Sequence, residues 1–309
     1  MRIAFRIDIS NSIGTGHFVR MSALAEAFES LGCLCAFFRG AHEPIDYKSF
    51  DIIILDTYEI SSDYISKLKT QNRLLACYDD NAFYKYDCHV LLNANFHAHE
   101  LNFRYSEEKP LTLLGPKYAL LRKEFHNTKP IEVKEAAKDI FVCFGGSDLR
   151  GFTPVAVNAL REIPGIHINI VLGERTTCDK EVYGMTSKYV RIFKNPAKIS
   201  EIMASCDMAI SGAGSMVYEL ACLGIPTIVV AQARNQQLIA NYLERYKLMK
   251  YAGDWDSFLN LRQETEKLLN DFGRRKTEGK RLAETVNIRG AIAAAKAILE
   301  AASSLVPLR

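Results

Sequence analysis

The chain has 309 residues, of which 48% are hydrophobic and 24% are charged, and its formal net charge is +3. This composition is ordinary for a globular protein, and a net charge this small, without a basic run, argues against a nucleic-acid partner. No apolar stretch approaches the roughly 20 residues that cross a bilayer, so we expect no stable membrane insertion.

Strand-like runs alternate with helical segments through the first half of the chain. Polar turns bound these runs, and the centre of "DIIILDT" is apolar throughout. Runs of this kind are typical of parallel strands whose two faces are both covered by helices. The pattern predicts strands over 2–8, 33–40, 51–57, 74–80 and 89–95, and helices over 18–31 and 62–70.

The same alternation restarts after residues 127–138, which lose hydrophobicity, gain charge and are the best candidate linker. We predict an α/β protein of two doubly wound, Rossmann-like domains, residues 1–130 and residues 131–309, the second including the C-terminal helices. Two such domains in tandem predict a ligand cleft between them, lined by the carboxyl ends of strands. The second half has predicted strands over 139–146, 167–174, 190–195, 206–214 and 225–232, a helix over 153–162 and a helical tail from about 255.

The stretch "RIDISNSIGTGHFVR", residues 6–20, sets His17 at the start of a predicted helix. Gly14 and Gly16 permit a close backbone approach or a positive φ. The positive end of a helix disfavours a protonated imidazole, so His17 would stay neutral near pH 7, as a general base must. The spacing fits equally well a plain glycine turn beside a helix cap. Arg6 and Asp8 share one face of the strand and reach the same region, unless one is simply a paired strand-end charge.

The run "CFGGSD", residues 143–148, follows the first strand of the second half. Gly145 and Gly146 open space, and Ser147 offers a hydroxyl and backbone donors for a phosphate oxygen. The run matches neither the dinucleotide nor the nucleoside-triphosphate fingerprint, so a plain turn between strand and helix remains the alternative.

A run of small residues directly precedes the predicted helix that contains Glu219. The run consists of Ser211, Gly212, Ala213, Gly214 and Ser215. Its composition suits a diphosphate at a helix N-terminus. Glu219 lies four residues after Ser215 on the same helix face, where a carboxylate can accept both hydroxyls of a ribose. The alternative is a first-turn glutamate that complements the helix dipole.

Two further strand ends carry polar side chains. Asn235 and Gln236 in "AQARNQQ" are amides suited to a sugar or a phosphate, although Asn235 also reads as a helix cap. Tyr78 and Asp79 begin the run "YDDN", whose carboxylates would orient a base or a sugar, or cap a turn.

Cysteine usage and the N-terminus point to a cytoplasmic protein. The eight cysteines include no CxxC pair, and no clustered His or Cys completes a metal site around Cys33 and Cys35. Buried thiols of a reducing compartment are the better interpretation. The chain enters a strand at once, without a secretory signal.

Taken in order, these stretches resemble the UDP-sugar hydrolase family of pseudaminic acid biosynthesis, which includes a spore-coat polysaccharide synthesis protein. The matching pieces are "RIDISNSIGTGHFVR", "YDDN", "LLGPKYALLRKEF", "CFGGSD", "SGAGSMVYELACLGIPTIVV" and the Asn235-Gln236 pair, and they span residues 6 to about 240. The resemblance implies a GT-B fold, with two Rossmann-like domains facing across a cleft. It also implies UDP-2,4-diacetamido-2,4,6-trideoxy-β-L-altropyranose as substrate, with UDP as a product.

By this resemblance His17 is the base that activates water, Glu219 holds the ribose, and Asn235 contacts the sugar or the diphosphate. The loop "RIFKNP" would present backbone groups to the uracil around Phe193. Gly151 stands where the family often carries an asparagine that contacts the substrate, which leaves the sugar specificity open.

The expected reaction is attack of water on the anomeric carbon with inversion, while helix N–H groups stabilise the departing UDP. No DxD motif suited to a diphosphate-bound metal is evident, and no cluster of His and Asp suggests one, so we expect no cofactor and no divalent cation. We expect a monomer or a weak dimer. Two alternatives remain: a GT-B glycosyltransferase whose histidine deprotonates an acceptor hydroxyl, and a nucleotide-sugar-binding subunit without catalysis.

Overall fold

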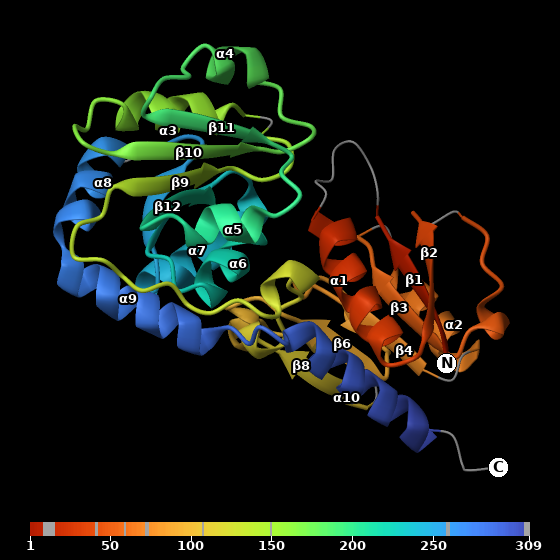
Figure 1. The fold of residues 1–309 in the computed structure, drawn as a ribbon. Helices are drawn as coiled ribbons and strands as arrows, with labels where there is room; N and C mark the ends of the chain where they lie inside the picture. Colours follow the sequence, from red (N-terminus) through yellow and green to blue (C-terminus); the bar gives the residue numbers. More distant parts are fainter. Residues whose placement is uncertain are drawn as a thin grey trace. The chain divides into compact units, whose positions relative to one another are not determined.

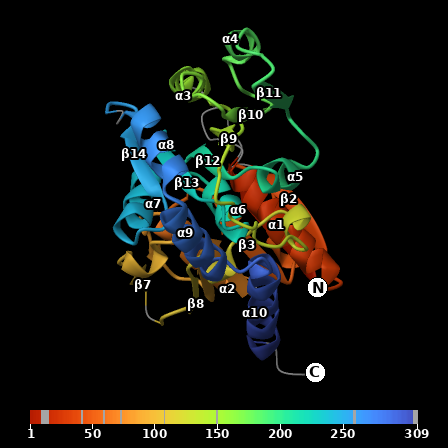
Figure 2. The same cartoon turned by 60° about the vertical axis from the view of Figure 1, so that its left-hand side comes forward.

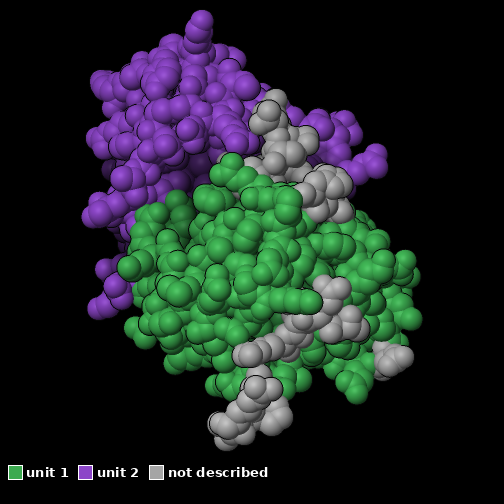
Figure 3. Space-filling view, turned by 90° about the vertical axis from the view of Figure 1, so that its right-hand side faces the viewer, with its two compact units in different colours: residues 1–126, 287–309 green, residues 127–286 purple. Residues whose placement is uncertain are grey.

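The protein is described from a computed structural model that covers residues 1–8, 16–40, 43–58, 60–71, 74–106, 108–148, 150–257 and 260–305. The chain forms two compact units, which Figure 3 colours separately. Unit 1 comprises residues 1–126 and 287–309, and unit 2 comprises residues 127–286.

Unit 1 is built on a parallel sheet, six-stranded within the described residues, in the order β2-β1-β3-β4-β6-β8. All five strands predicted for the first half are present, and β8 was not predicted. The main elements are β1 (Arg2–Ile7), α1 (Gly16–Ser30), β2 (Leu34–Arg39), β3 (Ile52–Asp56), α2 (Ser62–Gln71), β4 (Leu74–Tyr78), β6 (Val90–Asn93), β8 (Leu111–Leu114) and α10 (Gly290–Leu305). A small separate sheet pairs β5 (Lys85–Tyr86) with β7 (Arg104–Tyr105), and short 3₁₀ turns are η1 (Tyr47–Ser49), η2 (Ala98–Glu100), η3 (Pro116–Tyr118) and η4 (Lys123–Phe125).

Helices cover both faces of this sheet, because successive strand residues point to opposite sides. Ile3 and Phe5 of β1 face α1 and α10, whose Phe28 and Ile298 lie in the same apolar cluster. Ala4 of β1 belongs to a second cluster on the other face, together with side chains of α2. Figure 1 shows α10 running alongside the strands β6 and β8 of unit 1.

The position of α10 differs from the predicted domain boundary, which assigned all of residues 131–309 to the second domain. The alanine-rich face of α10 lies in the core of unit 1, with Ala291, Ala294 and Ala295 buried against the same cluster as Met21. Small residues on this face allow α10 to approach α1 closely, which burial of bulkier side chains would prevent. The first boundary, between residues 126 and 127, falls at the start of the predicted linker.

Unit 2 repeats the doubly wound plan with a parallel sheet, again six-stranded among the residues described, in the order β11-β10-β9-β12-β13-β14. This is the Rossmann strand order. The five predicted strands are present, and β14 was not predicted. Its elements are β9 (Asp139–Cys143), α3 (Phe152–Leu160), β10 (His167–Leu172), α4 (Asp179–Tyr183), β11 (Val190–Lys194), α5 (Ile199–Ala204), β12 (Met208–Gly212), α6 (Met216–Cys222), β13 (Thr227–Ala231), α7 (Arg234–Arg245), β14 (Lys250–Asp254), α8 (Leu261–Asn270) and α9 (Phe272–Thr285).

The two faces of the second sheet are covered by different helices. Ile140 and Ile170 pack against Val157 of α3 and Leu268 of α8. On the other side α6 contacts β12, α7 contacts β13, and α9 lies against α6, as Figures 1 and 2 both show. None of the helices in the described ranges has the length and apolar character that spanning a bilayer requires.

Candidate functional site

The chain order of the strands fixes where each unit can bind a ligand. In doubly wound sheets, ligands bind outside the carboxyl ends of the strands, at the point where the strand order reverses. In unit 1 that point lies between β1 and β3, where Ile7 is paired with Asp56. In unit 2 it lies between β9 and β12, where Cys143 is paired with Ser211. The predicted motifs "SNSIGTGH", "CFGGSD" and "SGAGS" all follow these strand ends.

His17 and Asp56 form a hydrogen-bonded pair at the switch point of unit 1. His17 is the second residue of α1 and is 6% exposed, while Asp56 is fully buried. The His17 Nδ1 atom lies 2.8 Å from Asp56 Oδ1. An ionised carboxylate only accepts hydrogen bonds, so Nδ1 carries the proton. In the neutral imidazole this leaves the lone pair on Nε2, the nitrogen that can accept a proton from another molecule.

Arg20 holds the same carboxylate from the other side. It lies three residues after His17, on the same face of α1. Arg20 Nε donates to Asp56 Oδ2 at 2.7 Å and Nη2 donates to Asp56 Oδ1 at 2.5 Å. Its Nη1 donates to Asp80 Oδ2 at 2.6 Å. One guanidinium therefore bridges the carboxylate at the end of β3 and the carboxylate two residues after β4.

Asp80 accepts two further hydrogen bonds. Tyr58 Oη donates to Oδ2 at 2.8 Å, and Asn95 Nδ2 donates to Oδ1 at 2.7 Å. Burial acts to raise the pKa of Asp80, but the charge of Arg20 and these donors outweigh it and lower the pKa. The Tyr58 ring meets the His17 ring edge-on, with centroids 4.8 Å apart. Asp80 is therefore a carboxylate at neutral pH, and three successive hydrogen bonds connect it to His17 through Asp56 and Arg20.

The two carboxyl groups of the run "YDDN" have different partners. Asp79, the predicted candidate, is buried and accepts hydrogen bonds from the backbone N–H groups of Asn81 and Ala82, so it caps the turn after β4. Asp80 faces His17's network instead. Tyr78 is 8% exposed, and its ring lies 4.1 Å from the Arg20 guanidinium carbon.

The other predicted residues of unit 1 are placed as follows. Arg6 donates to the Glu43 carbonyl and lies over the Tyr47 ring, at 5.6 Å from its centroid. Asp8 accepts from Thr57 Oγ1, and from the backbone N–H of Tyr58 at 2.5 Å. Both side chains are therefore engaged at the end of the sheet.

The glycine turn before His17 is only partly described. Gly14 lies outside the described residues. Gly16 is the first residue of α1, and its φ is not positive. A Cβ atom at this position would meet no described atom within 4 Å. A positive φ therefore does not explain the glycine at position 16, and no atom of the described residues requires it.

In unit 2 the "CFGGSD" turn is shaped by close backbone packing. Gly145 adopts φ +87°, a left-handed conformation that favours glycine. A Cβ atom on Gly173 would lie 2.4 Å from the backbone of Gly146, so the turn rests directly on the end of β10. Ser147 is half-buried at the tip of this turn.

Asp148 fixes the end of the same turn. Its carboxylate accepts hydrogen bonds from the backbone N–H groups of Phe152 and Thr153, each at 2.9 Å, at the start of α3. Gly151 has φ +69° with open space around its Cα, so the asparagine expected there would fit sterically.

The "SGAGS" turn packs against two glutamine side chains. A Cβ atom on Gly212 would lie 2.4 Å from Gln232 Oε1, and one on Gly214 would lie 3.4 Å from Gln236 Nε2. Gln232 Nε2 donates to Asp148 Oδ1 at 3.4 Å, which joins this turn to the "CFGGSD" turn. The two predicted phosphate loops of unit 2 are therefore neighbours.

The remaining predicted residues of unit 2 lie on α6, α7 and β11. Ala213 is buried, Ser215 is exposed, and Glu219 is 7% exposed within α6. Asn235 is exposed at the second position of α7, where Ala233 and not Asn235 is the N-cap residue. Gln236 Oε1 accepts from the backbone N–H of Gln232 at 2.9 Å. Phe193 is half-buried and is the next-to-last residue of β11, so it lies near the carboxyl end of an edge strand.

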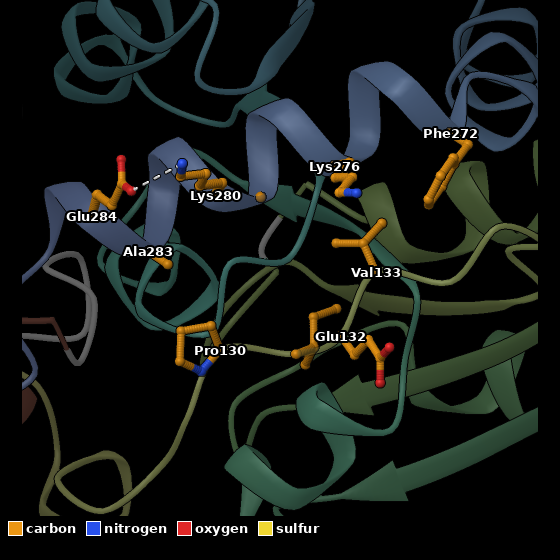
Figure 4. Close-up of a pocket in the computed structure, with 10 residues that line it drawn as sticks. Pro130, Glu132, Val133, Phe272, Lys276, Lys280, Ala283 and Glu284 are labelled. Atoms are coloured by element: carbon orange, nitrogen blue, oxygen red, sulfur yellow. Dashed lines mark ion pairs between the residues drawn. The ribbon is translucent and has the colours of Figure 1, made fainter.

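A cavity of about 510 Å³ lies elsewhere in unit 2, between residues 130–133 and α9 (Figure 4). Its lining includes Lys276 and Lys280, and Lys280 is 3.9 Å from Glu284. Ile131 donates its N–H to Leu223, just past the carboxyl end of α6, so the cavity lies toward the amino ends of the strands. It contains none of the predicted site residues.

Sequence reasoning missed Asp56 and Arg20, and of the two "YDDN" carboxylates it singled out Asp79 and not Asp80. The sequence held a signal for each: Asp56 ends an apolar strand, Arg20 shares a helix face with His17, and Asp80 adjoins the residue that was chosen. No group of three or more His, Cys, Asp or Glu side chains in the described part of the chain is arranged to hold a metal ion.

Comparison with known proteins gives matches in sequence and in fold. Residues 150–286 match a family described as a protein of unknown function, DUF354. An uncharacterized protein of Methanocaldococcus jannaschii, MJ1062, is 28% identical over 60% of this chain, and the match spans 41% of that protein. The UDP-2,4-diacetamido-2,4,6-trideoxy-β-L-altropyranose hydrolase of Campylobacter jejuni is 25% identical over 79% of this chain and 97% of its own length.

The solved structure of MurG from Acinetobacter baumannii covers 97% of this chain and all of its own, with a TM-score of 0.68 and 11% identity. A likeness at that identity concerns the fold alone. The chain therefore has the fold of the GT-B glycosyltransferases, and it is similar in sequence to a hydrolase of a UDP-linked diacetamido-trideoxy sugar.

Proposed function

We propose that this protein hydrolyses UDP-2,4-diacetamido-2,4,6-trideoxy-β-L-altropyranose to the free sugar and UDP, as a step of pseudaminic acid biosynthesis. The substrate comes from the similarity to the Campylobacter jejuni hydrolase. The observation that carries the chemistry is the His17–Asp56 pair, whose geometry leaves Nε2 of a neutral imidazole as the proton acceptor.

In this mechanism His17 takes a proton from water, and the water oxygen attacks the anomeric carbon. The bond between that carbon and the diphosphate oxygen breaks, and UDP leaves from the opposite face, which inverts the configuration. Asp56 stabilises the imidazolium that forms, because it accepts the Nδ1–H hydrogen bond throughout. The proton then returns to solvent from Nε2.

Unit 2 is assigned the nucleotide. The adjoining "CFGGSD" and "SGAGS" turns, with Gly146, Ser147 and Gly214, supply backbone donors for the developing diphosphate charge. Glu219 accepts the ribose hydroxyls, Asn235 and Gln236 contact the sugar or diphosphate, and Phe193 lies beside the uracil. Because these backbone donors stabilise the diphosphate charge without a metal ion, we expect turnover to continue in the presence of EDTA. Loss of turnover in EDTA would contradict this assignment.

The test is UDP release from the purified protein given the UDP-sugar alone, with no acceptor, in ¹⁸O-labelled water. We expect UDP to appear and the label to enter the sugar. Label in the phosphate would rule out attack at carbon, and UDP release only with an acceptor alcohol would indicate a glycosyltransferase.

The variant that tests the base is His17→Ala. It should abolish UDP release and leave UDP affinity nearly unchanged, because the imidazole acts on water and not on the nucleotide. His167→Ala is the matched control, since this histidine lies at the amino end of β10 with an aspartate partner of its own, Asp139. Undiminished turnover in His17→Ala would remove the mechanism.

A further inference from the structure

Arg20 lies where it can act on the imidazole of His17 as well as on the carboxylates. Its Nη2 atom is 3.1 Å from His17 Nδ1 and 2.5 Å from Asp56 Oδ1. Since a guanidinium only donates and Nδ1 already carries a proton, this approach is a charge contact and not a hydrogen bond. The side chain is 15% exposed, so water screens it little.

The charges around the imidazole are closely balanced. Two carboxylates, Asp56 and Asp80, face one guanidinium, so the cluster carries a single negative charge while His17 is neutral. Protonation of His17 makes the cluster neutral. The pKa of Arg20 is raised well above its ordinary value, because its carboxylate partners outweigh the effect of burial, and the guanidinium therefore stays charged.

Tyr58, Asn95 and Tyr78 lie around the pair and carry no charge at neutral pH, whereas Asp8 and Asp79 bring two further carboxyl groups to this end of the sheet. Tyr58, which meets the imidazole edge-on, has its pKa raised first by burial and then by the charge of Asp80, so it remains a neutral donor. Asn95 is an amide, and Tyr78 offers Arg20 an aromatic face. Asp8 accepts from Thr57 and from the Tyr58 backbone, on the β1 side of this region.

We propose that Arg20 and Asp80 are opposing positioning residues that set the proton balance of the His17–Asp56 pair. The positive charge of Arg20 offsets the negative charge of Asp56, which disfavours the imidazolium and keeps His17 available as a base. Asp80 limits this effect, because its negative charge is paired with the same guanidinium. This inference rests on the proposed function of His17 as the base.

The inference predicts shifts of opposite sign from two single substitutions. Arg20→Gln leaves the negative charges of Asp56 and Asp80 without their shared cation, so the imidazolium form is favoured and the acid limb of the kcat/KM profile should move up by about one pH unit or more. Asp80→Asn removes a carboxylate and should move the acid limb down. Arg20→Lys keeps the charge and should stay near the wild type. In the double variant Arg20→Gln, Asp80→Asn, the acid limb should return toward its wild-type position.

The experiment measures two quantities on the full chain across the pH range in which imidazole titrates. One is kcat/KM for UDP release. The other is the ¹³Cε1 shift of His17 in histidine-labelled protein, with the resonance assigned from the His17→Ala spectrum. A purely structural role of Arg20 would lower kcat without moving the midpoint of either curve.

Several outcomes overturn the inference: an Arg20→Gln midpoint equal to that of the wild type, or an Asp80→Asn midpoint that is unchanged or moves upward. If Arg20→Gln does not fold, Asp80→Asn and Arg20→Lys decide by the same criteria. The NMR titration needs no turnover. A wild-type protein that releases no UDP therefore contradicts the proposed function, while the titration still decides the charge balance.

Discussion

Asp56 accepts one hydrogen bond from His17 and two from Arg20, and its side chain is buried at the end of β3. A buried carboxyl group that accepts this many hydrogen bonds holds its partners in one orientation. For His17 this orientation decides which ring nitrogen can act as the base. Thus a residue that touches no substrate in the proposed reaction still determines the chemistry of one that does.

Asp56→Asn tests this at the residue scale. An amide of the same shape no longer stabilises the imidazolium that forms as water is deprotonated, so kcat should fall by about a hundredfold or more while UDP affinity is retained. The measurement is steady-state UDP release, with UDP binding by calorimetry. Asp51→Asn is the matched control, because Asp51 precedes the same strand and accepts from the backbone N–H of Arg2 at its opposite end. Wild-type kcat in Asp56→Asn would contradict the pairing.

At the scale of elements, the "CFGGSD" turn depends on how closely it rests on β10. Gly173→Ala places a methyl group 2.4 Å from the Gly146 backbone, which cannot move without the turn. We expect a loss of about 1–3 kcal/mol in the free energy of unfolding and a weaker affinity for UDP. Gly273→Ala is the control, since a Cβ atom there would meet only Asp271 Oδ1, at 3.7 Å, in α9 and away from both turns. Equal UDP affinities and equal stabilities in the two variants would show that the turn is not fixed by this contact.

Asp207 ties the segment before β9 to the start of β12. Its carboxylate accepts from Lys134 Nζ at 2.8 Å and from the backbone N–H groups of Lys138 and Asp139 at 2.8 and 2.9 Å. Burial acts to raise the pKa of Asp207, but these donors outweigh it and lower the pKa. The stability that Asp207 contributes is therefore present above the unfolded pKa of about 3.9 and is lost as pH falls through the lower, folded pKa.

Asp207→Asn should accordingly reduce the free energy of unfolding at pH 7 by about 1–3 kcal/mol, because hydrogen bonds to a charged acceptor are replaced by weaker ones. The difference from the wild type should shrink as the pH falls below the unfolded pKa. Urea unfolding at a series of pH values measures it. A difference that is the same at every pH would mean that the carboxylate charge plays no part.

At the scale of the whole molecule, the chain leaves unit 1 after residue 126 and returns to it at residue 287. The last two long helices before the C-terminus therefore serve different cores: α9 packs on α6 of unit 2, and α10 packs on α1 of unit 1. Each unit should respond separately to a cavity in its own core.

Ile298→Ala and Leu268→Ala test this division. Both side chains are fully buried, Ile298 in the core of unit 1 and Leu268 in that of unit 2. Each substitution should cost about 2–5 kcal/mol. Hydrogen exchange should show faster exchange in β1 and β3 for Ile298→Ala, and in β9 and β12 for Leu268→Ala. Loss of protection in β9 and β12 from Ile298→Ala would contradict the assignment of α10.

Local sequence patterns were enough to predict the two doubly wound α/β halves, ten of their strands and the position of each polar motif at a strand end. These features depend on local patterns: a run of five or six apolar residues with a turn after it specifies a buried parallel strand wherever it lies. The place of His17 at the first turn of a helix was predicted from the same kind of local pattern.

Which residues come into contact depends on the packing of the folded chain. His17 and Asp56 are 39 positions apart, and they pair because β1 and β3 are neighbours in the sheet, which no local pattern encodes. In the same way, the direction of the turn after β4, and not composition, selected Asp80 over Asp79 for the network. The assignment of α10 to unit 1 depends on which core its alanine face fits. Contacts of this kind follow from the packing of distant segments, and their free energy exists only once those segments are folded together.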